Sequence, residues 1–305
     1  MSKPHGMRLS EWGLLGLLSL LWGGSFFFSK VALAELPPLT VVLVRVSIAT
    51  GALWLYLRLR GIPVPARAGL WRAFLGMGML NSLLPFTLIF WGQTFIGSGL
   101  ASIINATTPV FSILVAHALT DDEKLSLGKL AGVALGLAGV IVLLGGEIAP
   151  GSGGALPGVL ACLGAALCYG LANTYGRRFR RMGIEPALGA FGQIASTMAM
   201  ALPLTLLVDR PWQIAAPGAA TWGALAGLAL LSTALAYIIY FRLIGAVGAT
   251  NTSLVTMLVP VSAILLGVGI LHERLSASQL GGMSLVGLGL LALDGRLLRR
   301  LRRVA

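Results

Sequence analysis

The chain has 305 residues, of which 57% are hydrophobic and only 10% are charged. Charged side chains this sparse cannot solvate a globule of such length, so the composition excludes a soluble domain and indicates an integral membrane protein. The net charge of +12 does not indicate nucleic-acid binding, because the basic residues form short clusters between apolar runs, which is typical of cytoplasmic membrane loops.

Ten apolar segments approach the roughly 20 residues that a helix needs to cross the hydrocarbon core. Short Gly- and Pro-rich joints separate them, and the longest polar joint, at 150–154, follows the fifth segment. The first segment follows a basic start but lacks a small-residue cleavage site, so we interpret it as a retained helix. The sequence therefore predicts an all-α integral membrane protein with ten transmembrane helices, at 11–33, 39–59, 70–91, 98–119, 127–144, 156–175, 187–207, 220–241, 250–271 and 277–293.

The distribution of Lys and Arg predicts the orientation of these helices. With the N-terminus inside, the cytoplasmic segments hold 18 of these residues and the outer segments hold 3. Because cytoplasmic loops carry an excess of Lys and Arg, we expect both termini to be cytoplasmic in a multi-pass protein of the bacterial inner membrane.

An internal repeat relates the two halves of the chain. Residues 71–114 align with 222–265 without a gap, and 12 of the 44 positions are identical, including Gly97/Gly248, Ser102/Ser253 and Pro109/Pro260. A repeat of five helices has an odd number, so the second copy must be inverted, as in many secondary transporters. The expected division is a first repeat at 10–147, a flexible linker at 148–155, a second repeat at 156–295 and a basic cytoplasmic tail at 296–305.

Three features recur in both halves. Each first helix has an aromatic-Gly pair, each fourth helix has the Gly…Ser…Pro run, and an acidic-basic-Leu-Ser junction follows at 123–126 and 273–276. In these features the chain resembles the drug/metabolite transporter superfamily, specifically two tandem EamA-type units over residues 11–295. The resemblance implies a central pathway between helices one, three, four, six, eight and nine, and its nearest functional parallel is amino-acid exporters of the YddG type.

Polar and aromatic side chains near the middle of the membrane are the candidates for lining that pathway, because polar groups there usually face a cavity or a partner helix. The repeat relates Asn81 to Ser232, Asn105 to Thr256 and Phe86 to Tyr237. The alternative is that the same groups only join helices by hydrogen bonds. The candidates are Trp22, Ser25, Asn81, Phe86, Asn105, Thr108, Tyr169, Asn173, Ser232, Tyr237 and Thr256.

Arg45 and two prolines have two interpretations each. Arg45 is a basic residue inside a predicted span, and it either contacts a substrate carboxylate or snorkels to the outer surface. Its counterpart in the second half lies close to Gln193. Pro109 and Pro260 each remove a backbone hydrogen bond in mid-helix, and we expect either hinges or static kinks satisfied by nearby Thr and Ser hydroxyls.

The acidic residues all lie at span ends or in loops, so the sequence lacks the mid-membrane carboxylate of a proton-coupled exporter. We expect a transporter that exports small metabolites, foremost amino acids, by alternating access and without ion coupling. A proton-coupled exporter of drugs or cationic compounds is the alternative. An integral-membrane lipid-modifying enzyme is less favoured, because His5, His117 and His272 are scattered.

No metal ligand set, nucleotide loop or other cofactor motif is evident in the sequence. The expected partners are a small-molecule substrate and the lipid bilayer, with no nucleic acid. Gly128, Gly132 and Gly136 give the fifth span a flat face for close helix contact. This face favours packing within the chain over dimerisation, although the choice between monomer and homodimer stays open.

Overall fold

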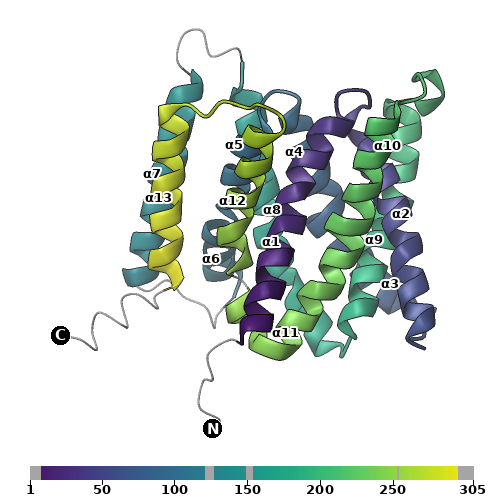
Figure 1. Cartoon of the computed structure of the whole chain (residues 1–305). Helices are drawn as coiled ribbons and strands as arrows, with labels where there is room; N and C mark the ends of the chain where they lie inside the picture. Colours follow the sequence, from purple (N-terminus) through teal and green to yellow (C-terminus); the bar gives the residue numbers. More distant parts are fainter. Residues whose placement is uncertain (1–7, 121–126, 149–153, 253, 295–305) are drawn as a thin grey trace.

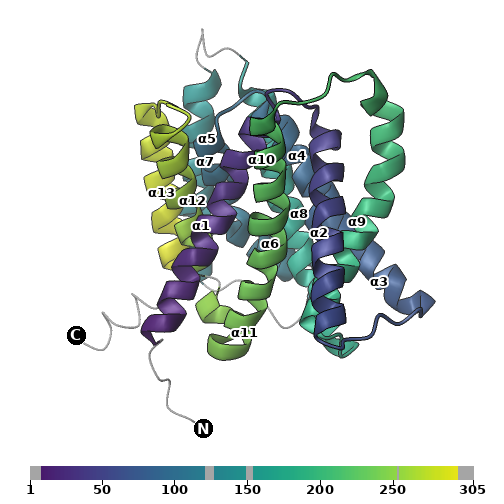
Figure 2. The same cartoon turned by 45° about the vertical axis from the view of Figure 1, so that its right-hand side comes forward.

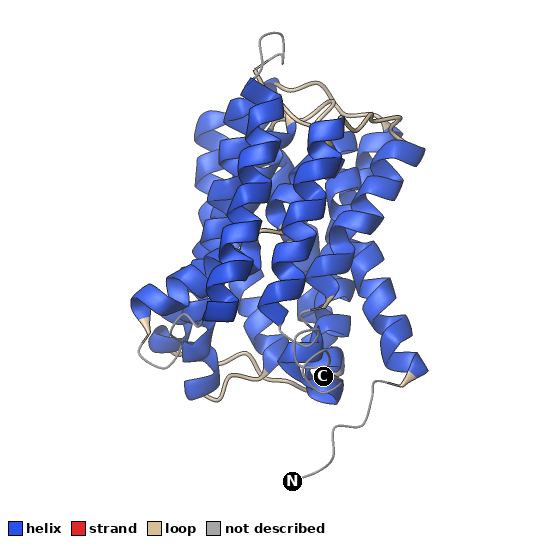
Figure 3. Ribbon diagram, turned by 90° about the vertical axis from the view of Figure 1, so that its left-hand side faces the viewer, coloured by secondary structure: helices blue, strands red, loops and turns tan. Residues whose placement is uncertain are grey.

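The computed structural model describes residues 8–120, 127–148, 154–252 and 254–294. These residues form helices whose connecting loops gather at the two ends of a bundle (Figure 3). The expected tail at 296–305, the junction at 123–126 and most of the linker at 148–155 lie outside the described residues.

The first half of the chain supplies eight helical segments. In the third span, two short α-helices are joined through a π-helical segment, η1. In the fourth span, two α-helices are separated by a break of two residues. In order they are α1 (Leu9–Ala32), α2 (Pro38–Leu59), α3 (Ala68–Gly78), η1 (Met79–Leu83), α4 (Leu84–Gln93), α5 (Ser98–Asn105), α6 (Thr108–Leu119) and α7 (Leu127–Ile148).

The second half repeats this order, with one 3₁₀ turn, η2, added between its second and third spans. Its segments are α8 (Leu156–Arg181), α9 (Pro186–Val208), η2 (Pro211–Gln213), α10 (Ala219–Ala226), the π-helical η3 (Gly227–Leu235), α11 (Ala236–Thr252), α12 (Val255–Gly269) and α13 (Ala277–Asp294). Shifted by 151 residues, η1 falls within η3.

Seven of the described helices are long and apolar enough to cross a membrane, and three more apolar helices are shorter. The seven include α1, α2, α8 and α9, together with the composite spans at Ala68–Gln93, Ser98–Leu119 and Ala219–Ile244. The chain is therefore an all-helical, multi-pass membrane protein.

The span at 98–119, expected as one helix, is divided between Asn105 and Thr108. Pro109 has no N–H to donate to the carbonyl four residues earlier. The Thr108 hydroxyl donates to that Asn105 carbonyl at 2.7 Å instead, and the Thr107 hydroxyl donates to the Ile104 carbonyl at 2.6 Å. Pro109 thus begins α6 rather than lying in mid-helix, whereas Pro260 does lie inside α12.

Helices of the first half pack mainly against helices of the second. Helix α1 lies against α10, α11 and α12, and α8 lies in the same way against α4, α5 and α6. Helix α2 packs on α9, while α7 and α13 form a pair at one edge of the bundle (Figures 1 and 2). These contacts come in matched pairs with the halves exchanged.

Glycine permits the close approach of α7 and α13. A Cβ atom on Gly289 of α13 would lie 2.7 Å from the Gly136 nitrogen and 2.8 Å from the Gly132 oxygen of α7. Two members of the glycine face expected on the fifth span therefore pack within the chain. This pair leaves the centre of the bundle to α1, α2, α4, α8, α9 and α11.

Candidate functional site

Arg45 lies in the centre of the bundle and is 5% exposed. Its Nε donates to the Thr233 hydroxyl in η3 at 2.9 Å, and its guanidinium carbon lies 3.8 Å from the centroid of the Phe86 ring in α4. Tyr169 and Tyr237 are the titratable side chains near the guanidinium among the described residues. The side chain does not snorkel to the surface, because the ring and the hydroxyl hold it inside.

Gln193 occupies the matching place on α9 and is 4% exposed. Pro38 begins α2 and Pro186 begins α9, so Arg45 and Gln193 are the eighth residues of equivalent helices. The Asn81 amide in η1 donates to Gln193 Oε1 at 3.0 Å and to the Tyr237 hydroxyl at 3.4 Å.

The two groups form one polar cluster with an approximate internal symmetry. Arg45 meets Phe86 of its own half and Thr233 of the other half, and Gln193 meets Tyr237 of its own half and Asn81 of the other. Phe86 and Tyr237 are equivalent under the repeat. We call these six residues the central cluster: Arg45, Asn81, Phe86, Gln193, Thr233 and Tyr237.

The π-helical segments η1 and η3 supply the cluster's Asn81 and Thr233. A π turn widens the helix and displaces its backbone hydrogen bonds. The Thr233 hydroxyl, which accepts from Arg45, donates to the Leu228 carbonyl five residues earlier at 2.8 Å. A single hydroxyl thus joins the buried cation to the irregular turn.

The other candidate residues are distributed around this cluster. The rings of Trp22 in α1 and Tyr240 in α11 are tilted by 45° to each other, with centroids 5.3 Å apart. Asn173 of α8 is exposed, and its amide donates to the Ser112 hydroxyl of α6 at 2.9 Å. Thr256 lies half-buried in α12.

Ser25, Asn105, Thr108 and Ser232 make no hydrogen bond to the central cluster within the part of the chain that the structure describes. The Thr108 hydroxyl is engaged by the backbone, and the Ser25 carbonyl accepts from Ser29 at 2.7 Å. The Asn105 Oδ1 and Ser232 Oγ atoms are buried without a hydrogen-bond partner, as are the hydroxyls of Ser82 and Ser196.

A cavity of about 460 Å³ reaches the central cluster from one end of the bundle, which we call the basic end: the end at which α1 begins, α2 ends and Arg58, Arg60 and Arg242 lie. Tyr237 belongs to both the cavity wall and the central cluster, so its ring forms the boundary between them. Other lining residues are Leu53, Tyr56, Arg60, Glu185, Pro186, Ala187, Ala190, Ile238, Phe241 and Arg242.

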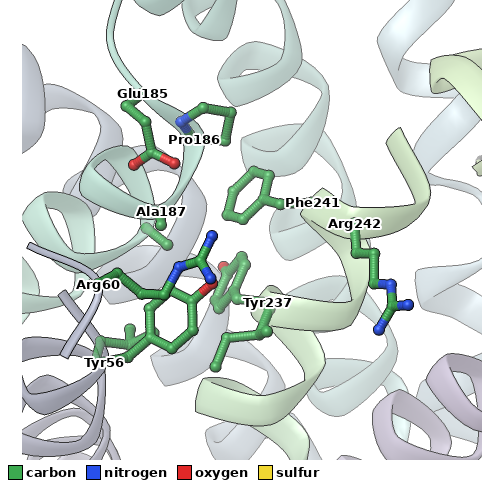
Figure 4. A pocket seen from close by; sticks show the side chains of 11 residues that line it. Tyr56, Arg60, Glu185, Pro186, Ala187, Tyr237, Phe241 and Arg242 are labelled. Carbon is green, nitrogen blue, oxygen red and sulfur yellow. The ribbon is translucent and has the colours of Figure 1, made fainter. Parts of the chain in front are cut away.

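The charges in this cavity are mainly positive. Figure 4 shows the Arg60 guanidinium among Tyr56, Ala187 and Tyr237, whereas the Arg242 guanidinium points away from them. The carboxylate of Glu185 is committed to the start of α9, where it accepts from the Leu188 N–H at 2.9 Å. The cavity thus presents the Arg60 guanidinium and aromatic faces.

At the opposite end of the bundle, three carboxylates bind helix N-termini. Asp209 accepts from the Thr40 N–H at 2.7 Å and from its hydroxyl at 2.9 Å. Glu35 accepts from the Gly218 N–H at 2.6 Å. Anions at a helix N-terminus are favoured by about 0.3–1 kcal/mol when exposed.

The third carboxylate belongs to Glu273. It accepts from the Ser98 N–H at 2.7 Å, from the Ser98 hydroxyl at 3.0 Å and from the Gly99 N–H at 3.0 Å. All three contacts join one half of the chain to the other. We call Glu35, Asp209 and Glu273 the carboxylate clasp.

Sequence reasoning found Arg45, Asn81, Phe86, Tyr169 and Tyr237 but did not select Gln193, Thr233 or the cavity wall. Gln193 has a sequence signal, because it is the position equivalent to Arg45 when the two proline-initiated helices are aligned. Tyr56, Arg60 and Glu185 have no such signal, because polar and aromatic residues near the ends of membrane spans are common.

Comparison with known proteins identifies the kind of molecule to which this site belongs. The model of the EamA-like transporter family matches residues 11–145 and again residues 156–293. A solved structure with 22% sequence identity has the same fold, with a TM-score of 0.67 over 96% of this chain and 99% of that one.

Curated relatives are similar over most of their length. A Bacillus subtilis protein, "Uncharacterized transporter YvbV", is 30% identical over 90% of this chain and 88% of its own. The "Probable amino-acid metabolite efflux pump" of Escherichia coli is 27% identical over 91% and 93%. The "Uncharacterized inner membrane transporter YedA" of the same species is 28% identical over 88% and 85%.

Proposed function

Because the chain belongs to the EamA-like transporter family, we propose that it exports small metabolites, foremost amino acids, across the bacterial inner membrane. Transport proceeds by alternating access through the central cluster, without obligatory ion coupling. The observation that carries this proposal is the buried Arg45, which is held by a hydroxyl from the opposite half of the chain and belongs to a cluster whose Tyr237 also lines the cavity.

The proposed topology has ten crossings, in two inverted repeats at 10–147 and 156–295 with both termini cytoplasmic. Support comes from the seven long and three shorter apolar helices and from the two separate family matches. The start of α1 and the end of α13 also lie at the same end of the bundle (Figure 1). The excess of Lys and Arg assigns that end to the cytoplasm.

Access alternates, in this proposal, between the basic end and the clasp end. The cavity opens at the basic end, and the carboxylate clasp joins the halves at the other, so the structure corresponds to a cytoplasm-open state. Rotation of Tyr237 would join the cavity to Arg45. Release of the clasp, with bending near Pro109 and Pro260, would then open the outer side.

An amino acid fits the chemistry of the central cluster. Its carboxylate would pair with Arg45, which is a charge-assisted contact with planar complementarity. Its side chain would lie against the aromatic faces of Phe86, Tyr169 and Tyr237. The relative named as a probable amino-acid metabolite efflux pump supports this choice of substrate.

A proton-coupled exporter of cationic compounds is less well supported. A cation would meet the positive charge of Arg45, and the cavity offers Glu185 only in a form already bound to the α9 N-terminus. The described Asp and Glu side chains, at positions 11, 35, 185, 209 and 273, lie at helix ends or in loops. None of these is placed to carry a proton through the middle of the bundle.

Counterflow in proteoliposomes tests the proposal. Vesicles loaded with unlabelled leucine, phenylalanine, methionine or threonine should accumulate the corresponding labelled amino acid without an ion gradient. Arg45→Gln should reduce the initial rate at least tenfold, because the carboxylate loses its ionic partner. Arg58→Gln is the matched control on the same helix, since Arg58 is exposed and lies outside the cavity wall; it should transport normally.

Two results would contradict the proposal. Folded wild-type protein that catalyses no exchange of any amino acid would remove the proposed substrate class. Exchange that stops when a proton gradient is collapsed at fixed amino-acid gradient would instead overturn the uncoupled mechanism and leave the substrate intact.

A further inference from the structure

Resting on the proposed transport function, we propose that the central cluster is selective for organic anions. A carboxylate that carries no ammonium group, such as a 2-hydroxy acid, binds more tightly than the amino acid with the same side chain. The protein thus exports short-chain carboxylates as well as amino acids.

The charge of Arg45 is the first reason. Within the described residues no carboxylate forms an ion pair with its guanidinium, whose polar contact is the neutral Thr233 hydroxyl and whose other close contact is the Phe86 ring. Burying a cation without a counter-charge is costly in a membrane protein. A bound anion would neutralise it, whereas a zwitterion would leave the total charge of the site unchanged.

The distance between the charges of an amino acid strengthens this effect. The ammonium group lies two bonds from the carboxylate carbon, so it would be held within roughly 6 Å of the guanidinium. Like charges at that separation in a protein interior repel by an amount comparable to the attraction gained by the carboxylate. A hydroxyl in the place of the ammonium removes the repulsion.

The neutral acceptors of the cluster do not compensate for the ammonium group. Gln193 Oε1 and the Tyr237 hydroxyl already accept from the Asn81 amide at 3.0 and 3.4 Å. The Thr233 hydroxyl already accepts from Arg45 and donates to Leu228. An ammonium donor would have to share these acceptors with the groups already bound to them, whereas an incoming carboxylate adds acceptors where Arg45 has donors to spare.

The cavity that leads to the cluster is lined by an excess of positive charge, as is the cluster itself. Arg60 and Arg242 line the cavity together with one carboxylate, Glu185, which is engaged by the α9 N-terminus, so positive charges outnumber negative ones. A cleft lined by one sign of charge concentrates ions of the other sign. The path and the binding position therefore select the same class of ligand, although they use different residues.

Competition between matched ligands tests the proposal. The full-length protein in nanodiscs is titrated with leucine, with 2-hydroxy-4-methylpentanoate and with leucinamide, and thermal stabilisation gives each half-saturating concentration. The phenylalanine series is measured in the same way. The hydroxy acid should saturate at a concentration at least tenfold below that of its amino acid, and the amide, which lacks the carboxylate, should not stabilise the protein.

Equal binding of leucine and its hydroxy acid would overturn the selectivity and leave amino-acid export standing. Binding of the hydroxy acids with no binding or counterflow of amino acids would support the selectivity and remove amino-acid export. Stabilisation by leucinamide, or by no ligand of either series, would contradict the anion site itself.

Variants assign the preference to Arg45. Arg45→Gln should weaken binding of the hydroxy acid at least tenfold and bring its affinity close to that of the amino acid, whereas Arg45→Lys should keep the order of ligands. Arg58→Gln should bind as the wild type. A preference that persists in a folded Arg45→Gln protein overturns the assignment, and the wild-type series decides the selectivity even where that variant does not fold.

Discussion

The position of Arg45 depends on two single contacts, one with an aromatic face and one with a hydroxyl. A cation over an aromatic ring gains about 0.5–2 kcal/mol, more when it is desolvated, and the 3.8 Å separation from the Phe86 ring lies within the effective range. The Thr233 hydroxyl directs the Nε edge of the guanidinium. The remaining guanidinium nitrogens can therefore serve a ligand.

Phe86→Leu should test the aromatic half of this arrangement. Loss of the ring removes the contact beneath the guanidinium and leaves space in the cluster, so we expect a loss of about 1–3 kcal/mol in stability and a several-fold lower rate of counterflow. Thermal unfolding in detergent and transport in proteoliposomes give the two quantities.

Phe86→Tyr is the matched variant for this change. It keeps the ring and reproduces the residue type found at the equivalent position 237, so it should retain most of both properties. Equal behaviour of the Leu and Tyr variants would show that the face of the ring does not hold Arg45.

At the scale of elements, helix termini and irregular turns carry the groups that matter. The π-helical η1 and η3 contribute Asn81 and Thr233 to the central cluster, and the N-termini of α2, α5 and α10 receive the carboxylate clasp. Among the central cluster, Arg45 and Gln193 lie instead within the regular helices α2 and α9. The parts of each span that depart from the ideal helix are therefore the parts that can change partners between states.

Neutralising the clasp should open the end of the bundle at which it lies. Each of Glu35→Gln, Asp209→Asn and Glu273→Gln weakens a charge-assisted contact between the two halves, and the triple variant should shift the population toward the outward-open state. Spin labels at Ala34→Cys and Ala216→Cys, in a protein without Cys162 and Cys168, report the change as a longer and broader distance distribution.

Glu11→Gln is the control for the clasp, because its carboxylate accepts from the Arg8 N–H at 2.7 Å within a single helix end and joins no two halves. It should leave the label distance unchanged. A triple clasp variant with the wild-type distance distribution would show that these contacts do not keep the end closed.

At the scale of the whole molecule, the two halves interlock rather than sit beside each other. Helix α1 packs among α10, η3, α11 and α12 of the second half, and α8 packs among α4, α5 and α6 of the first. The α7 and α13 pair stands apart at the edge (Figure 1). Movement of one half therefore changes the surroundings of the central cluster from both sides at once, which is what alternating access at a repeat interface requires.

Cysteine labelling tests the proposed orientation. In a protein without its native cysteines, Gln213→Cys should react with a membrane-impermeant maleimide in intact spheroplasts, because η2 is assigned to the outer side. Met182→Cys, between α8 and α9, should react only after lysis, since it follows the basic cluster at 177–181. The reverse pattern would invert the topology, and labelling of both positions from one side would contradict the number of crossings between them.

Much of the fold could be predicted from the sequence, because the signals for helices in a membrane are local. Apolar length, the Pro and Gly joints and the arginine clusters predict many of the helix ends to within a few residues. Helix α8 instead runs to Arg181 rather than 175, and α11 runs across a kink at Gly248 to Thr252 rather than ending at 241. The division of the span at 98–119 was not predicted. Its cause, the missing N–H of Pro109, is visible in the sequence, but whether the helix kinks or breaks depends on the hydroxyls that satisfy the freed carbonyls.

The candidate site was predicted in part. Arg45, Asn81, Phe86 and Tyr237 are unusual residues at membrane depth, and the repeat pairs Phe86 with Tyr237, so the sequence alone indicates them. By contrast, Asn105 and Ser232 have the same signal, yet among the described residues they make no hydrogen bond to the central cluster. Depth and polarity do not say which side of a helix meets the pathway.

The sequence by itself determined the class of molecule and the duplication of the unit, because composition and repetition do not depend on how helices pack. Only the tertiary structure decided that Arg45 faces Thr233, which is 188 residues away, and that three carboxylates hold the halves together at one end. Such contacts depend on crossing positions and helix rotation, which are fixed by side-chain packing over the whole bundle.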